Sequence, residues 1–171
     1  MERLPAGLGR TLALANAARV AEGERRASLF VEALLACTDR LPTARDAEEL
    51  ERRLEARLGH PSRRLAAYGT LRPGEANHAL LVHVGGVWRA GVVRGRLHPE
   101  GWGLTQGFPA LVPDARGERI PVDVLESAEL CASWPRLDAF EGQDYARVLV
   151  EVELEAGARV VANLYALRRS C

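Results

Sequence analysis

The chain has 171 residues, 47% of them apolar, which is enough for one ordinary domain with a buried core plus an appended segment. Its 23 basic residues balance its 23 acidic residues, and this lack of a basic surplus argues against nucleic-acid binding through phosphate neutralisation. Every basic residue is arginine, which excludes a lysine nucleophile or a lysine Schiff base.

Membrane insertion, secretion and metal binding find no support in the sequence. No apolar run approaches the roughly 18 residues of a membrane span, and the apolar start is too short and too interrupted to be a secretory signal. The three cysteines form no Cys-x-x-Cys motif, and no histidine pair has the helical spacing of a metal site. We therefore expect a cytoplasmic protein with no membrane contact, no metal and no other cofactor.

Residues 1–62 are predicted to be an α-helical extension. Three stretches carry apolar residues at helical spacing. These residues are Leu8, Leu12 and Ala15; Phe30, Ala33, Leu34 and Cys37; and Ala47, Leu50, Leu54 and Leu58. Thr43 is the expected N-cap of the third helix, and Gly59 its expected end. Such short amphipathic helices must pack on each other, on the following domain or on another subunit, so a homo-oligomer or protein partner would bind here.

Residues 63–171 are predicted to be a separate domain of a different character. Six segments rich in valine and bounded by glycine or proline indicate strands, and "ANHALLVHV" and "SAELCASWPRLDAF" indicate two inserted helices. The last two strands are joined by "AGA", which favours a hairpin. The expected class is α+β, with a small mixed β-barrel-like sheet of about six strands. Pro121 predicts a bent or edge strand.

Two stretches carry the residues of chemical interest, "AAYGTLRPGEANHALL" at 66–81 and "LDAFEGQDYARVLVEVEL" at 137–154. Taken singly, both have structural interpretations. Tyr68-Gly69-Thr70 is typical of a strand end where glycine adopts a positive φ, and Glu141-Gly142 is typical of a surface acid before a capping glycine. The first stretch contains no nucleophile, but a loop that opens at glycine can present backbone N–H groups to an anion.

Together the two stretches resemble the signatures of the gamma-glutamylcyclotransferase-like family, particularly its gamma-glutamylamine cyclotransferase branch. The first signature falls on Tyr68, Gly69, Thr70, Leu71, Gly74, Asn77 and His78, and the second on Leu137, Asp138, Glu141, Gly142, Tyr145 and Arg147. "GFPALV" resembles the segment that members carry between them. The similarity runs from residue 64 to about residue 168. The chain departs from the family pattern at "RIPVDVLES", where members usually carry a Gly-Glu-(apolar)-Tyr strand.

The resemblance implies a cyclisation of gamma-glutamyl amines or peptides. In this reaction the α-amine of the substrate attacks its own γ-carbonyl, which yields 5-oxoproline and releases an amine, so the enzyme supplies no nucleophile. Glu141 matches the family's general base, and the amides from Gly69 through Thr70 to Leu71 would face the oxyanion and the carboxylate. Tyr68 and Tyr145 would line the pocket, although packing alone explains both tyrosines equally well.

The remaining signature residues are interpreted as structural. Asn77 is expected to cap the first inserted helix, and His78 to be structural. Arg147 is expected to form a salt bridge, and Cys131 to be buried on a helix face. A second function from a different class stays open: a non-catalytic module of the same fold that binds a small carboxylate or serves assembly. The presence of Glu141 favours the enzyme, because a module without activity does not need a base.

Overall fold

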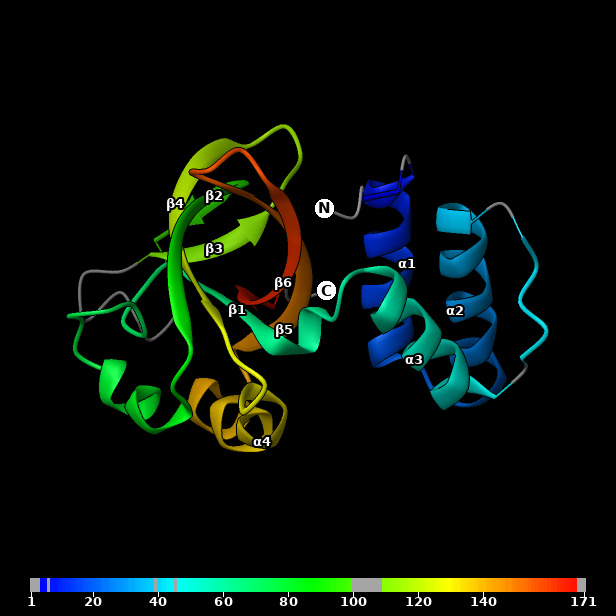
Figure 1. Cartoon of the computed structure of the whole chain (residues 1–171), viewed down its shortest axis with the longest axis horizontal. Coiled ribbons are helices and arrows are strands. Elements are labelled where there is room, and N and C mark those ends of the chain that lie inside the picture. The colour runs from blue at the N-terminus through cyan, green and yellow to red at the C-terminus, as the bar shows by residue number, and fades with distance from the viewer. Residues whose placement is uncertain (1–3, 6, 39, 45, 100–108, 169–171) are drawn as a thin grey trace. The chain divides into compact units, whose positions relative to one another are not determined.

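The computed structural model describes residues 4–5, 7–38, 40–44, 46–99 and 109–168, and it divides into two compact units, Met1–His60 and Pro61–Cys171 (Figure 1). Among the described residues, the first unit is helical, and the second contains the strands and one further α-helix. Among the described residues, no helix combines the length and the apolar character needed to cross a membrane.

The first unit contains three helices, α1 (Leu8–Val20), α2 (Gly23–Thr38) and α3 (Ala47–Arg57). Helix α1 packs on α2, and α2 packs on α3. The apolar stripes are buried as the periodicity predicts: Phe30, Ala33 and Leu50 are at most 1% exposed. The N-cap of α3 is Asp46 and not Thr43, because the Asp46 carboxylate accepts hydrogen bonds from the backbone N–H groups of Glu48 and Glu49.

The second unit is a mixed sheet with helical segments between its strands. In chain order these are η1 (Pro61–Arg63), β1 (Arg64–Ala67), η2 (His78–Leu80), η3 (Val82–Val84), β2 (Val87–His98), β3 (Ala110–Pro113), β4 (Glu118–Glu126), α4 (Leu130–Glu141), β5 (Tyr145–Leu154) and β6 (Arg159–Leu167). The first predicted inserted helix is thus two 3₁₀ turns, η2 and η3, and the second is α4.

The sheet closes into a barrel. Its strand order is β3-β2-β4-β1-β6-β5, and an additional β2–β5 pairing joins the two sides, so that five strands form the barrel and β3 extends it at β2. The β1–β6 pair is parallel and all others are antiparallel. The predicted α+β class with a mixed, barrel-like sheet of about six strands is therefore confirmed.

Two apolar clusters occupy opposite faces of the strands. Successive side chains of a strand alternate, so Leu65 and Ala67 of β1 join one cluster while Ala66 joins the other. The cluster that contains Leu65 and Ala67 also includes Leu130 of α4 and Leu81, which lies between the two 3₁₀ turns. Figure 1 accordingly shows α4 and these turns together at one end of the barrel.

Pro121 does not lie in an edge strand, contrary to one of the two expectations. Strand β4 lies between β2 and β1. The β1 ladder, however, ends at Asp123, and within the described part of the chain Pro121 pairs with Val92 of β2 alone. The missing N–H of proline therefore affects a position where β4 has one neighbouring strand, and the sheet tolerates it.

The barrel closes where β2 passes close to β5, and this contact requires a glycine. A Cβ atom on Gly91 would lie 2.9 Å from Cγ1 of Val152 and 3.0 Å from the carbonyl oxygen of Glu153. These are β5 atoms at the point where Gly91 pairs with Leu154. A side chain here would therefore push β2 and β5 apart.

We predict that Gly91→Ala lowers the free energy of unfolding by about 1–3 kcal/mol, because the added methyl group overpacks the β2–β5 contact. Gly9→Ala is the matched control, since a Cβ atom on this exposed residue of α1 meets nothing within 4 Å. The control should leave stability unchanged or raise it slightly. Chemical denaturation of the two variants tests this, and equal effects would contradict the close-contact explanation.

Candidate active site

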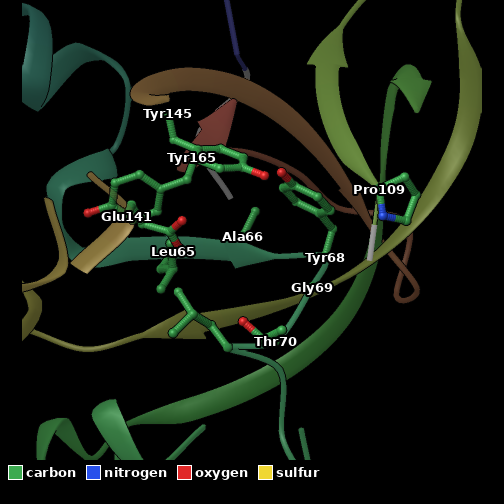
Figure 2. Close-up of a pocket in the computed structure, with 10 residues that line it drawn as sticks. Leu65, Ala66, Tyr68, Gly69, Thr70, Pro109, Glu141, Tyr145 and Tyr165 are labelled. Carbon is green, nitrogen blue, oxygen red and sulfur yellow. The ribbon is translucent and has the colours of Figure 1, made fainter. Parts of the chain in front are cut away.

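One pocket lies where the loop after β1 faces the end of α4 and the start of β5. It is lined by Leu65, Ala66, Tyr68, Gly69, Thr70, Leu71, Pro109, Glu141, Tyr145 and Tyr165, and its space, including the open mouth, is about 440 Å³. All the site residues predicted from the sequence are among these. Segments about 70 residues apart in the chain therefore meet at one cavity, as Figure 2 shows.

The loop residues from Tyr68 to Leu71 line this cavity. The carbonyl groups of Gly69 and Thr70 accept hydrogen bonds from Arg72 and Asn77, which shape the turn. Within the described part of the chain, no acceptor contacts the N–H groups of Gly69, Thr70 or Leu71. The expected positive φ is absent at Gly69 and is found at Gly74 instead, with φ of 84°. The turn is therefore made further along the loop.

Glu141 brings a buried carboxyl group to the pocket. It is the last residue of α4, and its side chain is directed into the cavity (Figure 2). The helix ends there because Gly142 takes a φ of 73° and donates its N–H to the carbonyl of Asp138. Glu141 is 8% exposed, and burial raises its pKa from 4.5 to about 7. Near neutral pH it can therefore accept a proton and return it.

All three tyrosines of the chain line this pocket. The hydroxyl of Tyr68 accepts a hydrogen bond from the backbone N–H of Leu111 at 3.2 Å, and burial raises its pKa. The rings of Tyr68 and Tyr145 point toward each other across the cavity (Figure 2). The sequence interpretation missed Tyr165. The β5–β6 hairpin places Tyr165 opposite Arg147, so the register of that hairpin is the signal that could have identified it.

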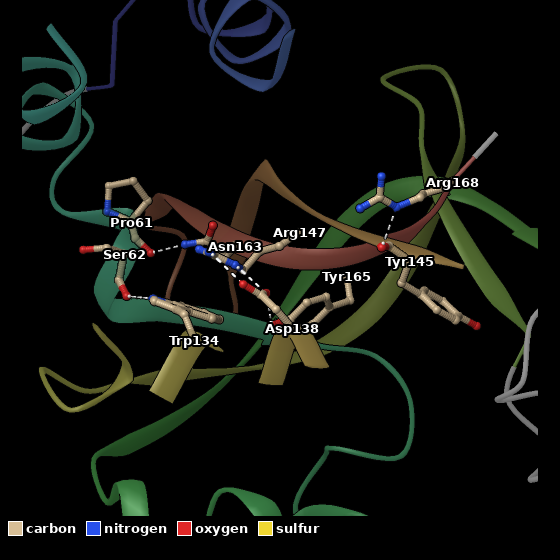
Figure 3. Close-up of polar contacts among 9 residues, drawn as sticks. All are labelled: Pro61, Ser62, Trp134, Asp138, Tyr145, Arg147, Asn163, Tyr165 and Arg168. Atoms are coloured by element: carbon tan, nitrogen blue, oxygen red, sulfur yellow. Dashed lines mark hydrogen bonds and ion pairs between the residues drawn. The ribbon is translucent and has the colours of Figure 1, made fainter. Parts of the chain in front are cut away.

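Tyr165 belongs to a chain of polar contacts behind the pocket, drawn in Figure 3. Its hydroxyl donates to Oδ1 of Asp138 at 2.7 Å, and burial raises the pKa of the phenol. Arg147 donates to both carboxylate oxygens of Asp138, which confirms the expected salt bridge. The guanidinium also lies 4.5 Å from the ring centre of Trp134, whose indole N–H donates to the carbonyl of Ser62.

Three other sequence expectations meet different outcomes. Asn77 precedes η2 but makes no side-chain capping hydrogen bond, so the capping prediction is wrong. His78 has a structural setting, with its ring Nδ1 3.3 Å from the carbonyl oxygen of Leu71 and its ring against Trp88. Cys131 is exposed, because the buried face of α4 begins one residue earlier, at Leu130. The described residues contain no cluster of side chains suited to hold a metal ion.

Comparison with known protein families identifies a family that contains these pocket residues. The model of the family "Gamma-glutamyl cyclotransferase, AIG2-like" matches residues 65–170, which is most of the chain and all of the pocket. The chain belongs to this family. A comparison with curated proteins gave no match.

Several solved structures are similar to part of this chain. YkqA from Bacillus subtilis is 31% identical over 63% of this chain and 36% of its own, with a TM-score of 0.48. An AIG2-like protein from Mus musculus is 25% identical over 63% of this chain and 78% of its own, with a TM-score of 0.47. An uncharacterised protein from Pyrococcus horikoshii is 26% identical over 63% of this chain and 79% of its own, with a TM-score of 0.45. The match thus spans about a third of the length of YkqA.

We predict that Glu141→Gln stabilises the fold at alkaline pH. A folded pKa above the unfolded value means that the stability contributed by this carboxyl is fully present below about pH 4.5 and is lost as pH rises through about 7. The Gln variant carries no charge at this position. Its free energy of unfolding relative to that of the wild type should therefore rise between pH 5 and 8, by on the order of 3 kcal/mol. Denaturation curves across this range measure the gain.

The control for this prediction is Glu153→Gln. The hydrogen bond and ion pair with Arg119 hold the pKa of this exposed carboxyl below its usual value, so its charge favours the folded state. Its replacement should therefore give no stabilisation at pH 8. A Glu141→Gln variant that gains no stability as pH rises would show that Glu141 is not titrating from a buried site.

Proposed function

We propose that this protein is a gamma-glutamyl cyclotransferase that acts on a gamma-glutamyl amine or peptide and releases 5-oxoproline and a free amine. The observation that carries the proposal is that the buried Glu141 and the loop residues from Gly69 to Leu71 line one cavity. All lining residues lie within the match to the family model, so the proposal concerns the unit Pro61–Cys171.

The reaction begins with a proton transfer to Glu141. Its carboxylate accepts a proton from the α-ammonium of the substrate, and the amine that results attacks the γ-carbonyl carbon of the same molecule. The new C–N bond closes a five-membered ring, and the carbonyl oxygen becomes an oxyanion. The Glu141 carboxyl returns its proton to the leaving nitrogen, and the carboxylate then takes the second proton from the ring nitrogen. The original bond to the leaving nitrogen breaks as the oxyanion returns to a carbonyl, and Glu141 passes the second proton to the released amine. Glu141 is therefore an unchanged carboxylate at the end.

Backbone amides are the groups that the pocket offers to negative charge. The described lining residues include no cationic side chain, and Glu141 is itself an acid. The N–H groups of Gly69, Thr70 and Leu71 would therefore hold the α-carboxylate and the developing oxyanion. Such fixed donors need little reorganisation during the reaction, which makes them effective at stabilising developing negative charge.

The pKa of Glu141 suits both halves of this reaction. A carboxyl with the usual pKa would be a weak acceptor for an ammonium proton, whereas a pKa of about 7 brings the two groups closer in proton affinity. The same value lets the protonated form donate to the leaving amine. The alternative, a carboxylate-binding module without turnover, does not require a base at this position, and the experiments below distinguish the two.

We expect Glu141→Gln to reduce 5-oxoproline release from gamma-glutamyl compounds by about 10²–10⁴-fold, because an amide cannot accept the ammonium proton. Release of 5-oxoproline by the purified proteins, measured over a panel of gamma-glutamyl amines and peptides, tests this. The matched control is Glu129→Gln, which changes an exposed acid at the other end of α4. A Glu141→Gln variant that keeps more than a tenth of the wild-type rate would assign the base elsewhere.

We also expect kcat/KM to depend on the ionisation of Glu141. The active form of the free enzyme is the carboxylate, so kcat/KM should rise about tenfold per pH unit below about pH 7 and then level off. The residual activity of Glu141→Gln should lack this acid limb. A wild-type profile that stays flat from pH 5 to 8 would contradict the assignment of Glu141 as the base.

A further inference from the structure

Helix α4 carries two carboxyl groups near Tyr165, and the hydroxyl of Tyr165 donates its hydrogen bond to one of them. The Tyr165 ring lines the pocket beside Glu141, yet its hydroxyl donates to Asp138 (Figures 2 and 3). We propose that Asp138 is a positioning residue that accepts this hydrogen bond and so prevents the phenol from donating to Glu141. The purpose of this device rests on the proposed function, but its test does not.

The two carboxyl groups lie on one face of α4, near one phenol. Asp138 and Glu141 are three residues apart on α4, so they lie on neighbouring turns, with Cβ atoms roughly 5–6 Å apart. Tyr165 approaches this side of the helix from β6. A phenol has one proton to donate, and the distance of 2.7 Å between its oxygen and Oδ1 of Asp138 shows which acceptor it uses.

Asp138 is itself held in place from two sides. Nε and Nη2 of Arg147 donate to its two oxygens at 2.9 and 3.2 Å, in the forked geometry that fixes a carboxylate plane. Arg147 is in turn fixed by Trp134, whose ring lies under the guanidinium and whose N–H bonds to Ser62. The acceptor for Tyr165 therefore has a defined orientation, and the phenol has a fixed partner.

The titratable groups around Glu141 come from four elements. They are Tyr68 at the end of β1, Tyr145 on β5, Tyr165 on β6 and Asp138 on α4 itself, and the guanidinium of Arg147 on β5 pairs with Asp138. A hydrogen bond donated to a carboxylate stabilises the charged form and lowers its pKa. Donation from Tyr165 to Glu141 would therefore oppose the effect of burial and weaken the base.

The experiment reads the titration of Glu141 from stability, without any substrate. In any background, the free energy of unfolding of the chain with Glu141, minus that of the same chain with Glu141→Gln, follows the ionisation of Glu141. We expect this difference to change between about pH 5 and 7 in the wild type. In Asp138→Ala, where the phenol is released, the change should lie roughly one to two pH units lower.

Loss of the Asp138 charge alone would also lower the pKa of Glu141, so a second background separates the two effects. Asp138→Ala/Tyr165→Phe has the same charge change but no phenol donor. The proposal requires its titration to lie at least about one pH unit above that of Asp138→Ala. Equal midpoints in the two backgrounds would overturn the proposal, because charge alone would then explain the shift.

Asp138→Asn is the conservative control. Oδ1 of Asp138 accepts from both Tyr165 and Nε of Arg147, and an asparagine oxygen can keep both bonds while the charge is lost. The titration should therefore lie above that of Asp138→Ala. An Asp138→Asn midpoint as low as that of Asp138→Ala would contradict the proposal.

If Asp138→Ala does not fold, the Glu141 titration in Tyr165→Phe tests the proposal instead. Because the hydroxyl of Tyr165 donates to Asp138, its removal should leave the midpoint of Glu141 in place. A raised midpoint would show that the phenol already stabilises the Glu141 carboxylate, and the proposal would fail. A wild type that releases no 5-oxoproline would reject the proposed function alone, since each of these titrations is measured without turnover.

Discussion

The pocket depends on how α4 is attached to the sheet, because Glu141 is the last residue of that helix. The attachment combines apolar packing and directed bonds. Leu130 and Leu137 are fully buried, Trp134 bonds to Ser62 of η1, and Asp138 binds Arg147 of β5. These contacts leave the end of α4 little freedom, so the Glu141 carboxyl remains at a buried position that an isolated carboxylate would avoid.

The barrel brings the other half of the site to this point. Strand β1 lies between β4 and β6: Leu65 pairs with β6, and the β4 ladder continues to the strand's end at Ala67, where the loop begins. The same β6 pairs with β5, whose first residue, Tyr145, follows the end of α4 after three intervening residues. A loop of amides and a helix end from distant segments thus face one cavity. Neither would have a defined position if the strands did not pair.

The site illustrates a conflict between stability and chemistry. Burial raises the pKa of Glu141 to about 7, which corresponds to on the order of 3 kcal/mol of folding free energy lost when the carboxylate forms at alkaline pH. The same shift makes the group suitable for moving protons near neutral pH. The bond from Tyr165 to Asp138, rather than to Glu141, is consistent with a site that preserves this shift.

Local patterns in the sequence determined the elements and their chemistry, whereas pairing between distant segments decided the partners. Alternating residues predicted the β5–β6 hairpin, and the two motifs indicated Glu141 and the amide loop, because periodicity and turn chemistry act over a few residues. The partner of Asp138 and the place of Tyr165 in the pocket depend on the β5–β6 register and on the packing of α4. The exposure of Cys131 depends on which side of α4 meets the sheet, and a shift of one residue along a helix turns a side chain by about 100°. Only the assembled barrel specifies these relations, since they arise from contacts that no short stretch of the chain contains.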